Sequence, residues 1–118
     1  MITVTIHHDE NRHVSAFEFS GHADYDETGK DLVCAGASTI AIGTVNAIYA
    51  LLNLEPKIEQ AAEGGGYLRV ELPTELDEAV DSKLQFTTQV MTAQIYSMVQ
   101  NYSEYIQINY KQVGGGTE

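Results

Sequence analysis

Two stretches near the N-terminus alternate between apolar and polar residues. In residues 2–7, isoleucine and valine alternate with threonine and histidine, which is the two-residue period of a half-buried strand. The polar run 9–12 interrupts this pattern, and residues 14–20 resume it with both phenylalanines on one face. Because the interruption is short, we expect the two strands to form a hairpin.

The pattern changes twice in the next thirty residues or so. Residues 21–33 are mostly polar and rich in acidic side chains, which predicts an exposed, mobile loop of the kind that carries function. Residues 34–52 contain many alanines and β-branched residues and no Asp, Glu, Lys or Arg. This composition predicts a helix covered by protein on nearly all sides, which Asn53 and Pro56 would end. Its serine, threonines and asparagine favour a buried helix over a membrane span.

The second half of the chain repeats the order of strands followed by a helix. Strands are expected at 57–62 and 67–72, separated by a glycine-rich turn, and Thr74 is expected to cap the helix that follows. One face of that helix carries an apolar stripe that consists of Leu76, Val80, Leu84, Met91, Ile95, Met98 and Tyr102. Its weakest stretch is 86–88, where we expect the helix to bend or break. A last alternating stretch at 104–111 predicts a closing strand.

The predicted order β-β-α-β-β-α-β indicates an α+β protein with two layers. A mixed sheet would form one layer, and the two main helices would pack on it as the other. The chain has 118 residues, which suits one domain, 1–118, with the active-site loop 21–33 inside it.

The net charge restricts the partners that the protein can bind. Seventeen acidic residues against six basic ones give a formal net charge of −11. Nucleic acid and anionic membranes need clustered lysines and arginines, so neither is expected as a direct partner. A basic protein partner would be attracted, although acidity also serves solubility alone.

The single cysteine and the N-terminal sequence indicate the compartment. One cysteine cannot form an intramolecular disulfide, and no basic segment with a following apolar core precedes the first strand. Both observations favour the reducing cytoplasm. The apolar helix also indicates burial against a second subunit, and a homodimer is the commonest such assembly.

Cys34 and His22 lie at the two ends of the predicted loop. Cys34 would begin the apolar helix, where free backbone N–H groups favour a thiolate and can receive an oxyanion. His22 follows Gly21 at the end of the second strand, and closing the loop would bring imidazole and sulfur together as base and nucleophile. By themselves the two residues also fit a structural cysteine and a solvated histidine.

Two motifs narrow these alternatives. Gly21-His22-Ala23 and Asp31-Leu32-Val33-Cys34-Ala35-Gly36-Ala37-Ser38, with eleven residues between His22 and Cys34, resemble the paired signature motifs of the Prp family, the bacterial ribosomal-processing cysteine proteases. The resemblance extends over essentially the whole chain. It implies an endopeptidase that removes a short N-terminal extension from a large-subunit ribosomal protein, cutting after aromatic residues in some bacteria, and so supports ribosome assembly.

The resemblance also assigns roles to individual residues. It implies that Cys34 is the nucleophile and His22 the general base, while Asp31 orients His22 or fixes the loop. Ser38, one helical turn after Cys34, would hydrogen-bond near the site, with a buried hydroxyl bonded within the helix as the alternative. Gly21 would serve the geometry of the turn.

No cofactor and no metal are expected. Residues 24–29 match the start of a calcium loop, but Asp31 and Ala35 stand where an apolar residue and a glutamate are needed. The histidines of the first hairpin, His7, His8 and His13, lack the arrangement of a catalytic zinc site. A non-catalytic, ribosome-associated module that binds a basic protein tail remains the alternative function, and a thiol redox role is disfavoured because no resolving cysteine exists.

Overall fold

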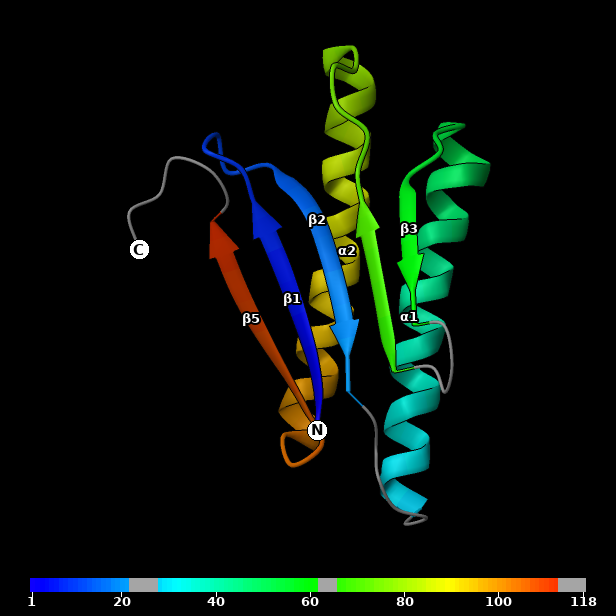
Figure 1. The fold of residues 1–118 in the computed structure, drawn as a ribbon, viewed down its shortest axis with the longest axis vertical. Coiled ribbons are helices and arrows are strands. Elements are labelled where there is room, and N and C mark those ends of the chain that lie inside the picture. Colours follow the sequence, from blue (N-terminus) through cyan, green and yellow to red (C-terminus); the bar gives the residue numbers. More distant parts are fainter. Residues whose placement is uncertain (22–27, 62–65, 113–118) are drawn as a thin grey trace.

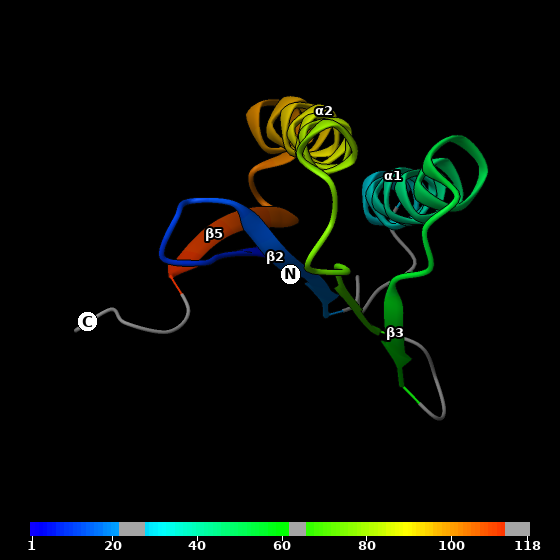
Figure 2. The same cartoon turned by 90° about the horizontal axis from the view of Figure 1, so that it is seen from above.

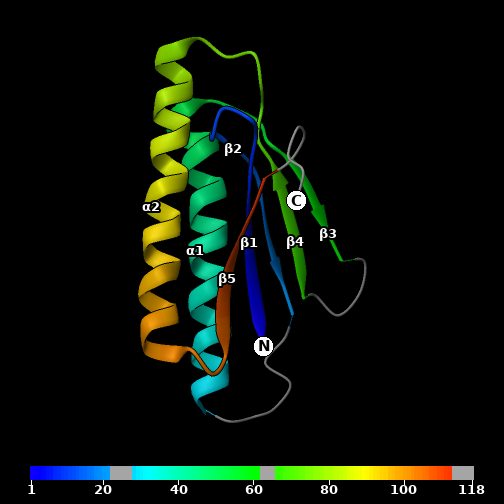
Figure 3. The ribbon, with the colours of Figure 1, turned by 90° about the vertical axis from the view of Figure 1, so that its left-hand side faces the viewer.

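A mixed five-stranded sheet carries both helices on one of its faces (Figure 1). The computed structural model describes residues 1–21, 28–61 and 66–112. Seen from above and from the side, the two helices form one layer and the sheet the other (Figures 2 and 3). Along the chain the elements are β1 (Ile2–His8), β2 (Val14–Ser20), α1 (Thr28–Leu52), β3 (Lys57–Gln60), β4 (Tyr67–Glu71), α2 (Glu78–Tyr102) and β5 (Ile106–Gln112). The predicted α+β fold and element order are therefore confirmed.

The strands lie in the order β3-β4-β2-β1-β5. β1 and β2 form the predicted antiparallel hairpin, with an irregularity in register at His7 and His8. The turn between them depends on Asp9, whose carboxylate accepts the N–H groups of Asn11 and His13 at 2.8 and 3.0 Å. β4 pairs antiparallel with β2 and β3, whereas β5 pairs parallel with β1, and this parallel pair makes the sheet mixed.

Alternate residues of the strands face the helices and form the core. Ile2, Val4 and Ile6 of β1 and both phenylalanines of β2 are buried, in agreement with the two-residue period of the sequence. α2 adds Leu84, Thr88, Met91 and Ile95 from one of its faces. Polar side chains such as Glu18 and Arg69 lie on the other face of the sheet, and neither α1 nor α2 covers it (Figure 3).

α2 differs from its prediction at two places. The helix runs without a break through residues 86–88, because Thr88 is fully buried and its hydroxyl donates to the carbonyl oxygen of Gln85 at 2.8 Å. The predicted cap at Thr74 is also wrong, since the N-cap residue is Asp77 and its side chain makes no capping hydrogen bond. Core packing thus holds the helix where local sequence preference is weak.

The side chain of Gln85 ties α2 to the start of β2. Its Oε1 accepts the N–H of Val14 at 2.7 Å, and its Nε2 donates to the carbonyl oxygen of Val14 at 3.0 Å. The amide therefore satisfies both backbone groups of a buried strand residue, as a neighbouring strand would.

α1 begins earlier and is less covered than expected. It starts at Thr28, so residues 28–33 of the predicted loop are helical, while residues 22–27 lie outside the described part of the chain. The helix packs against α2 and supplies Val33, Ala37 and Ile48 to the core. Yet Ile42 is 57% and Leu51 80% exposed, so the prediction of a helix covered on nearly all sides is wrong for the single chain.

The apolar stretch of α1 has a second property. Residues Leu32–Leu52 have a mean hydropathy of 1.5, so length and composition alone would allow them to cross a membrane. In this fold the same stretch contributes buried residues to the core between the helices and the sheet, which accounts for part of its apolar composition.

Candidate active site

Cys34 lies at a pocket between α1 and the ends of four strands. The pocket has a volume of about 360 Å³, and the cysteine in its wall is partly exposed. The lining residues are Ile2 of β1, Phe19 to Gly21 at the end of β2, Cys34, Ala37, Ser38, Ala41 and Ile42 of α1, Gln60 of β3, and Gly66 to Leu68 at the start of β4. The thiol thus sits in a largely apolar hollow that a ligand can enter.

The start of α1 at Thr28 changes one part of the predicted chemistry. Cys34 lies in the second turn of the helix, whereas the free N–H groups belong to the first turn. The expectation that Cys34 begins the helix, with those N–H groups beside its thiolate and at the oxyanion, is therefore wrong. The polar composition of residues 28–31 favours a loop, but the first turn of a helix also accepts polar and acidic residues.

Ser38 lies one turn after Cys34, and both residues line the pocket. The predicted shared face is thus observed. Ser38 is exposed, and within residues 1–21, 28–61 and 66–112 its hydroxyl has no hydrogen bond. The alternative of a buried hydroxyl bonded within the helix is therefore wrong.

Gly21 has a geometric function at the mouth of the pocket. Its φ of +100° lies in the left-handed region, and a Cβ atom there would collide with the carbonyl oxygen of Met1. Its N–H donates to the carbonyl oxygen of Gly66 at 2.9 Å, which joins the end of β2 to the chain entering β4. Only glycine tolerates both the positive φ and the lack of space for a Cβ atom. Gly21 therefore fixes the direction in which the chain leaves β2 at the pocket.

Two of the predicted site residues cannot be placed in the same way. His22 follows Gly21 directly but lies outside the described residues. Asp31 belongs to the first turn of α1, and its side chain is likewise outside the description. The structure therefore brings together Cys34, Ser38 and Gly21, while the positions of the His22 imidazole and the Asp31 carboxylate remain predictions.

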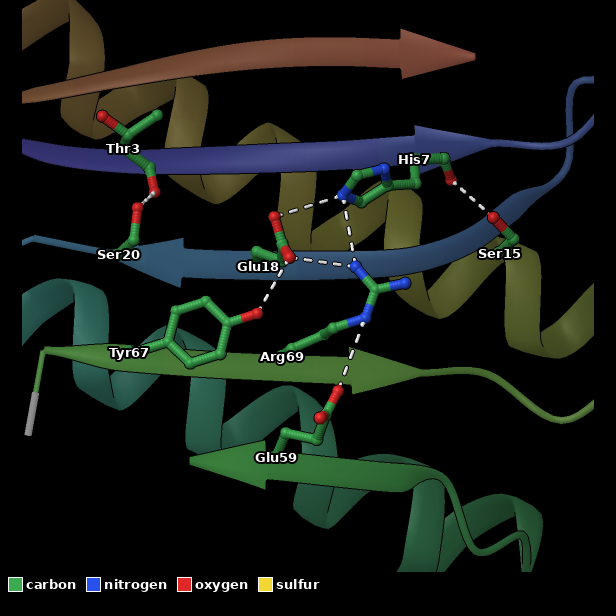
Figure 4. A network of polar contacts seen from close by, with 8 residues as sticks. All are labelled: Thr3, His7, Ser15, Glu18, Ser20, Glu59, Tyr67 and Arg69. Carbon is green, nitrogen blue, oxygen red and sulfur yellow. Dashed lines mark hydrogen bonds and ion pairs between the residues drawn. The ribbon is translucent and has the colours of Figure 1, made fainter. Parts of the chain in front are cut away.

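The sequence did not reveal a polar network centred on Glu18 (Figure 4). Glu18 Oε2 accepts hydrogen bonds from the Tyr67 hydroxyl at 3.0 Å and from Arg69 at 2.9 Å. His7 Nε2 lies 3.2 Å from Oε1 of Glu18, and the carboxylate makes Nε2 the donor. Arg69 also lies 3.8 Å from Glu59 of β3. The network joins four strands on the face of the sheet away from the helices.

These contacts set the ionisation of the network. Burial alone would raise the pKa of Glu18, but hydrogen bonds from His7, Tyr67 and Arg69 bring that pKa below its ordinary value of 4.5. Burial and the hydrogen bond to Glu18 raise the pKa of Tyr67 above 10.0. At neutral pH the carboxylate is therefore charged, and the phenol is a neutral donor.

His7 is accordingly a hydrogen-bond partner of Glu18. Its Nδ1 is buried and has no hydrogen-bond partner among the residues that the structure describes. Within the described ranges, no group of three or more His, Cys, Asp or Glu side chains is arranged to hold a metal ion. Alternation along the strands could have placed Glu18, Tyr67 and Arg69 on polar faces, but it could not show that β2 and β4 are neighbours.

Comparison with known proteins gives the family. Residues 1–107 match the family model described as cysteine protease Prp. The ribosomal processing cysteine protease Prp of Staphylococcus aureus (strain Mu50) is 38% identical over 111 residues, which cover 94% of this chain and 100% of the relative.

Two solved S. aureus structures show the same fold. One is an essential ribosomal processing protease Prp in complex with a substrate peptide, with 33% identity, a TM-score of 0.80, and coverage of 94% of this chain and 100% of the other. The second holds a covalently linked product peptide, with 34% identity, the same TM-score and the same coverage. By its sequence and its fold, the chain belongs to the Prp family of cysteine proteases.

Proposed function

We propose that this protein is an endopeptidase in which Cys34 and His22 form a catalytic dyad. The observation that carries the proposal is the position of Cys34 in an open pocket whose wall also contains Gly21, the residue directly before His22. Because His22 directly follows Gly21, a short segment after β2 is enough to bring its imidazole to the sulfur of Cys34. Membership of a cysteine protease family supplies the reaction class.

The proposed reaction has two halves. His22 takes the proton of the Cys34 thiol, and the sulfur attacks the carbonyl carbon of the scissile bond to form a tetrahedral intermediate. His22 then protonates the leaving amine, and water, deprotonated by the same imidazole, hydrolyses the thioester and frees the thiol. No cofactor takes part. Asp31 is proposed to orient His22, and Ser38 to hydrogen-bond to a bound peptide from its exposed position in the pocket.

We propose the N-terminal extension of a large-subunit ribosomal protein as the substrate. The S. aureus relatives are ribosomal processing proteases, and ribosomal proteins are basic, so the charge of −11 on this chain favours their approach. The apolar pocket lining, with Ile2, Phe19 and Leu68, suits an aromatic side chain beside the scissile bond. Such a role places the enzyme in the cytoplasm, which cell fractionation tests.

The dyad is tested by steady-state kinetics on four proteins. Wild type, Cys34→Ala, His22→Ala and Asp31→Asn are assayed on a peptide that spans the extension of the ribosomal protein from the same organism. Loss of either dyad member should lower kcat by roughly 10³-fold or more, and Asp31→Asn should lower it less. Circular dichroism confirms that each variant is folded. A His22→Ala variant with wild-type kcat would remove the histidine from the mechanism.

The alternative function is a non-catalytic module that binds a basic protein tail. The partly exposed thiol at a pocket favours the enzyme over this module, because tail binding needs no nucleophile. Alkylation by iodoacetamide separates the two. The enzyme predicts that wild type reacts faster than His22→Ala, whereas equal rates in the two proteins would favour the module.

We also propose a homodimer formed through the outer faces of the two helices. A groove of about 530 Å³ runs between α1 and α2, and beside it Leu51 is 80%, Phe86 65% and Val90 42% exposed. Burying such side chains against a second copy removes apolar surface from water. Light scattering should give twice the mass of one chain for wild type and a single mass for Phe86→Glu. A single mass for wild type would refute the dimer.

A further inference from the structure

β3 is the outermost strand of the sheet, in the order β3-β4-β2-β1-β5. Among residues 1–21, 28–61 and 66–112 it pairs with β4 alone, so its other edge has no partner strand in this part of the chain. All four of its residues, Lys57–Gln60, are exposed. The side view shows it at the margin of the sheet next to β4 (Figure 3). An edge of this kind offers backbone N–H and C=O groups to another extended chain.

The pairing with β4 shows which residues offer those groups. Ala61 donates its N–H to the carbonyl oxygen of Tyr67 at 3.2 Å, and the register continues with Glu59 opposite Arg69. In an antiparallel pair, hydrogen-bonded and non-hydrogen-bonded residues alternate. The backbone N–H and C=O groups of residues 57, 59 and 61 therefore point toward β4. Those of Ile58 and Gln60 point the other way, to the free edge.

The same edge leads into the Cys34 pocket. Gln60 lines that pocket together with Cys34, and β3 runs from Lys57 toward it. Glu59 contacts Arg69 on the open face of the sheet (Figure 4), so Ile58 and Gln60 carry their side chains on the opposite face, the face of the helices. Ile58, 37% exposed, thus adds an apolar contact next to the pocket.

We infer that the peptide substrate binds as an additional strand on the free edge of β3, with its scissile bond at Cys34. This inference rests on the proposed function and identifies how that site holds its substrate. The residue opposite Ile58 would accept from its N–H and donate to its C=O. The same pair of hydrogen bonds at Gln60, two residues further along β3, would place the substrate peptide at the pocket. Proteins commonly bind extended peptides at sheet edges in this way.

The charged residues of β3 do not block this edge. Lys57 and Glu59 lie on the open face of the sheet, beside β4 residues with which they pair, and not across the free edge. The strand offers two outward residues, so pairing adds a modest, reversible contribution to binding, which suits a substrate that must leave after cleavage.

The first test removes one outward N–H from the enzyme. Ile58→Pro deletes the N–H that faces the free edge and leaves the hydrogen bonds to β4, because residue 58 does not donate to β4. Ile58→Ala is the matched control, since it loses the side chain and keeps the N–H. Relative to this control, Ile58→Pro should raise KM roughly fivefold, as expected for one hydrogen bond, with kcat and iodoacetamide alkylation of Cys34 unchanged.

The second test alters the substrate, and so does not depend on how Ile58→Pro folds. Peptides with a single N-methyl group at each of the four residues on either side of the scissile bond are assayed with wild type. KM should rise at alternate residues on one side only. A uniform scan, together with equal KM for Ile58→Pro and Ile58→Ala, would overturn the inference.

Two further outcomes are distinguishable. If wild type does not cut the unmodified peptide, the proposed function fails, whatever the edge of β3 does. If Ile58→Pro converts a wild-type dimer to a single chain in light scattering, while Ile58→Ala does not, the edge pairs with a second copy, and the inference is again overturned.

Discussion

Substitution of Gly21 tests whether the turn at the pocket requires glycine. In Gly21→Ala the new residue must keep a φ of +100°, which costs about 1–2 kcal/mol for a residue with a Cβ atom. The methyl group would also collide with the carbonyl oxygen of Met1, and relieving such a contact costs about 1–3 kcal/mol. Reduced freedom of the unfolded chain returns about 0.4–1 kcal/mol. The free energy of unfolding should therefore fall by roughly 1–5 kcal/mol.

Urea denaturation followed by circular dichroism measures this change. With a slope of about 1–3 kcal/mol per molar urea, the midpoint should fall by at least about 0.3 M. Gly43→Ala is the matched control, because the same methyl group at Gly43 meets nothing within 4 Å. That site is an exposed helix position of the single chain and lines the groove proposed as the dimer contact. Both glycine variants are therefore compared in the Phe86→Glu background, where the control should gain about 0.5–1 kcal/mol.

If the account of Gly21 is right, the urea midpoint must fall in Gly21→Ala and rise in Gly43→Ala. A Gly21→Ala midpoint equal to or above that of Phe86→Glu alone would refute it. Peptide cleavage by Gly21→Ala should fall as well, since the residue sets the direction in which the chain reaches His22.

Three other predictions follow from the polar contacts and the charge. Glu18→Gln should lower the free energy of unfolding by roughly 1 kcal/mol at pH 7. Because the pKa of Glu18 is lowered in the fold, its contribution is complete above pH 4.5 and lost as the pH falls through the lowered pKa. The urea midpoints of wild type and Glu18→Gln should therefore converge at low pH. A difference that stays constant with pH would contradict this, as would a Glu71→Gln variant that lowers the midpoint at pH 7 as much as Glu18→Gln does. Gln85→Ala should cost about 1–3 kcal/mol, since buried Val14 loses the partner of its N–H, whereas Gln100→Ala should leave the midpoint within about 0.5 kcal/mol of wild type. Finally, high salt should raise KM for a peptide that retains its basic flank and leave KM unchanged for the same peptide without it; equal responses would exclude charge steering.

Much of the fold could be predicted because the apolar pattern is clear. The alternation in residues 2–7 and 14–20 predicted a hairpin that the structure contains, and the stripe in α2 predicted the buried residues Leu84, Met91 and Ile95. Such patterns can be recognised in the sequence because each strand or helix has one face that must be buried.

The errors lie where tertiary contacts outweigh local preference. The polar residues 28–31 favour a loop when read alone, yet residues 28–33 form the first turns of α1, whose later residues pack into the core. At Thr88, packing against the sheet keeps helical a stretch whose threonines and phenylalanine have low helix propensity. Neither effect is visible in a window of neighbouring residues.

The same limit applies to the site. The two motifs identified Cys34, Ser38 and Gly21, which the structure places at one pocket. The hydrogen bond from Tyr67 to Glu18 joins residues 49 positions apart, and Gln60 reaches the pocket only because β3 pairs with β4. Contacts of that kind depend on strand order and register, which single-sequence patterns do not determine.

The central claim is that Cys34 is the nucleophile of a peptidase. Its most direct test is to incubate wild type and Cys34→Ala with the ribosomal extension peptide and to measure the products by mass spectrometry. We predict a single cut by wild type and none by Cys34→Ala, with both proteins folded. Equal cleavage by the two proteins, or no cleavage by reduced, folded wild type, would contradict the account.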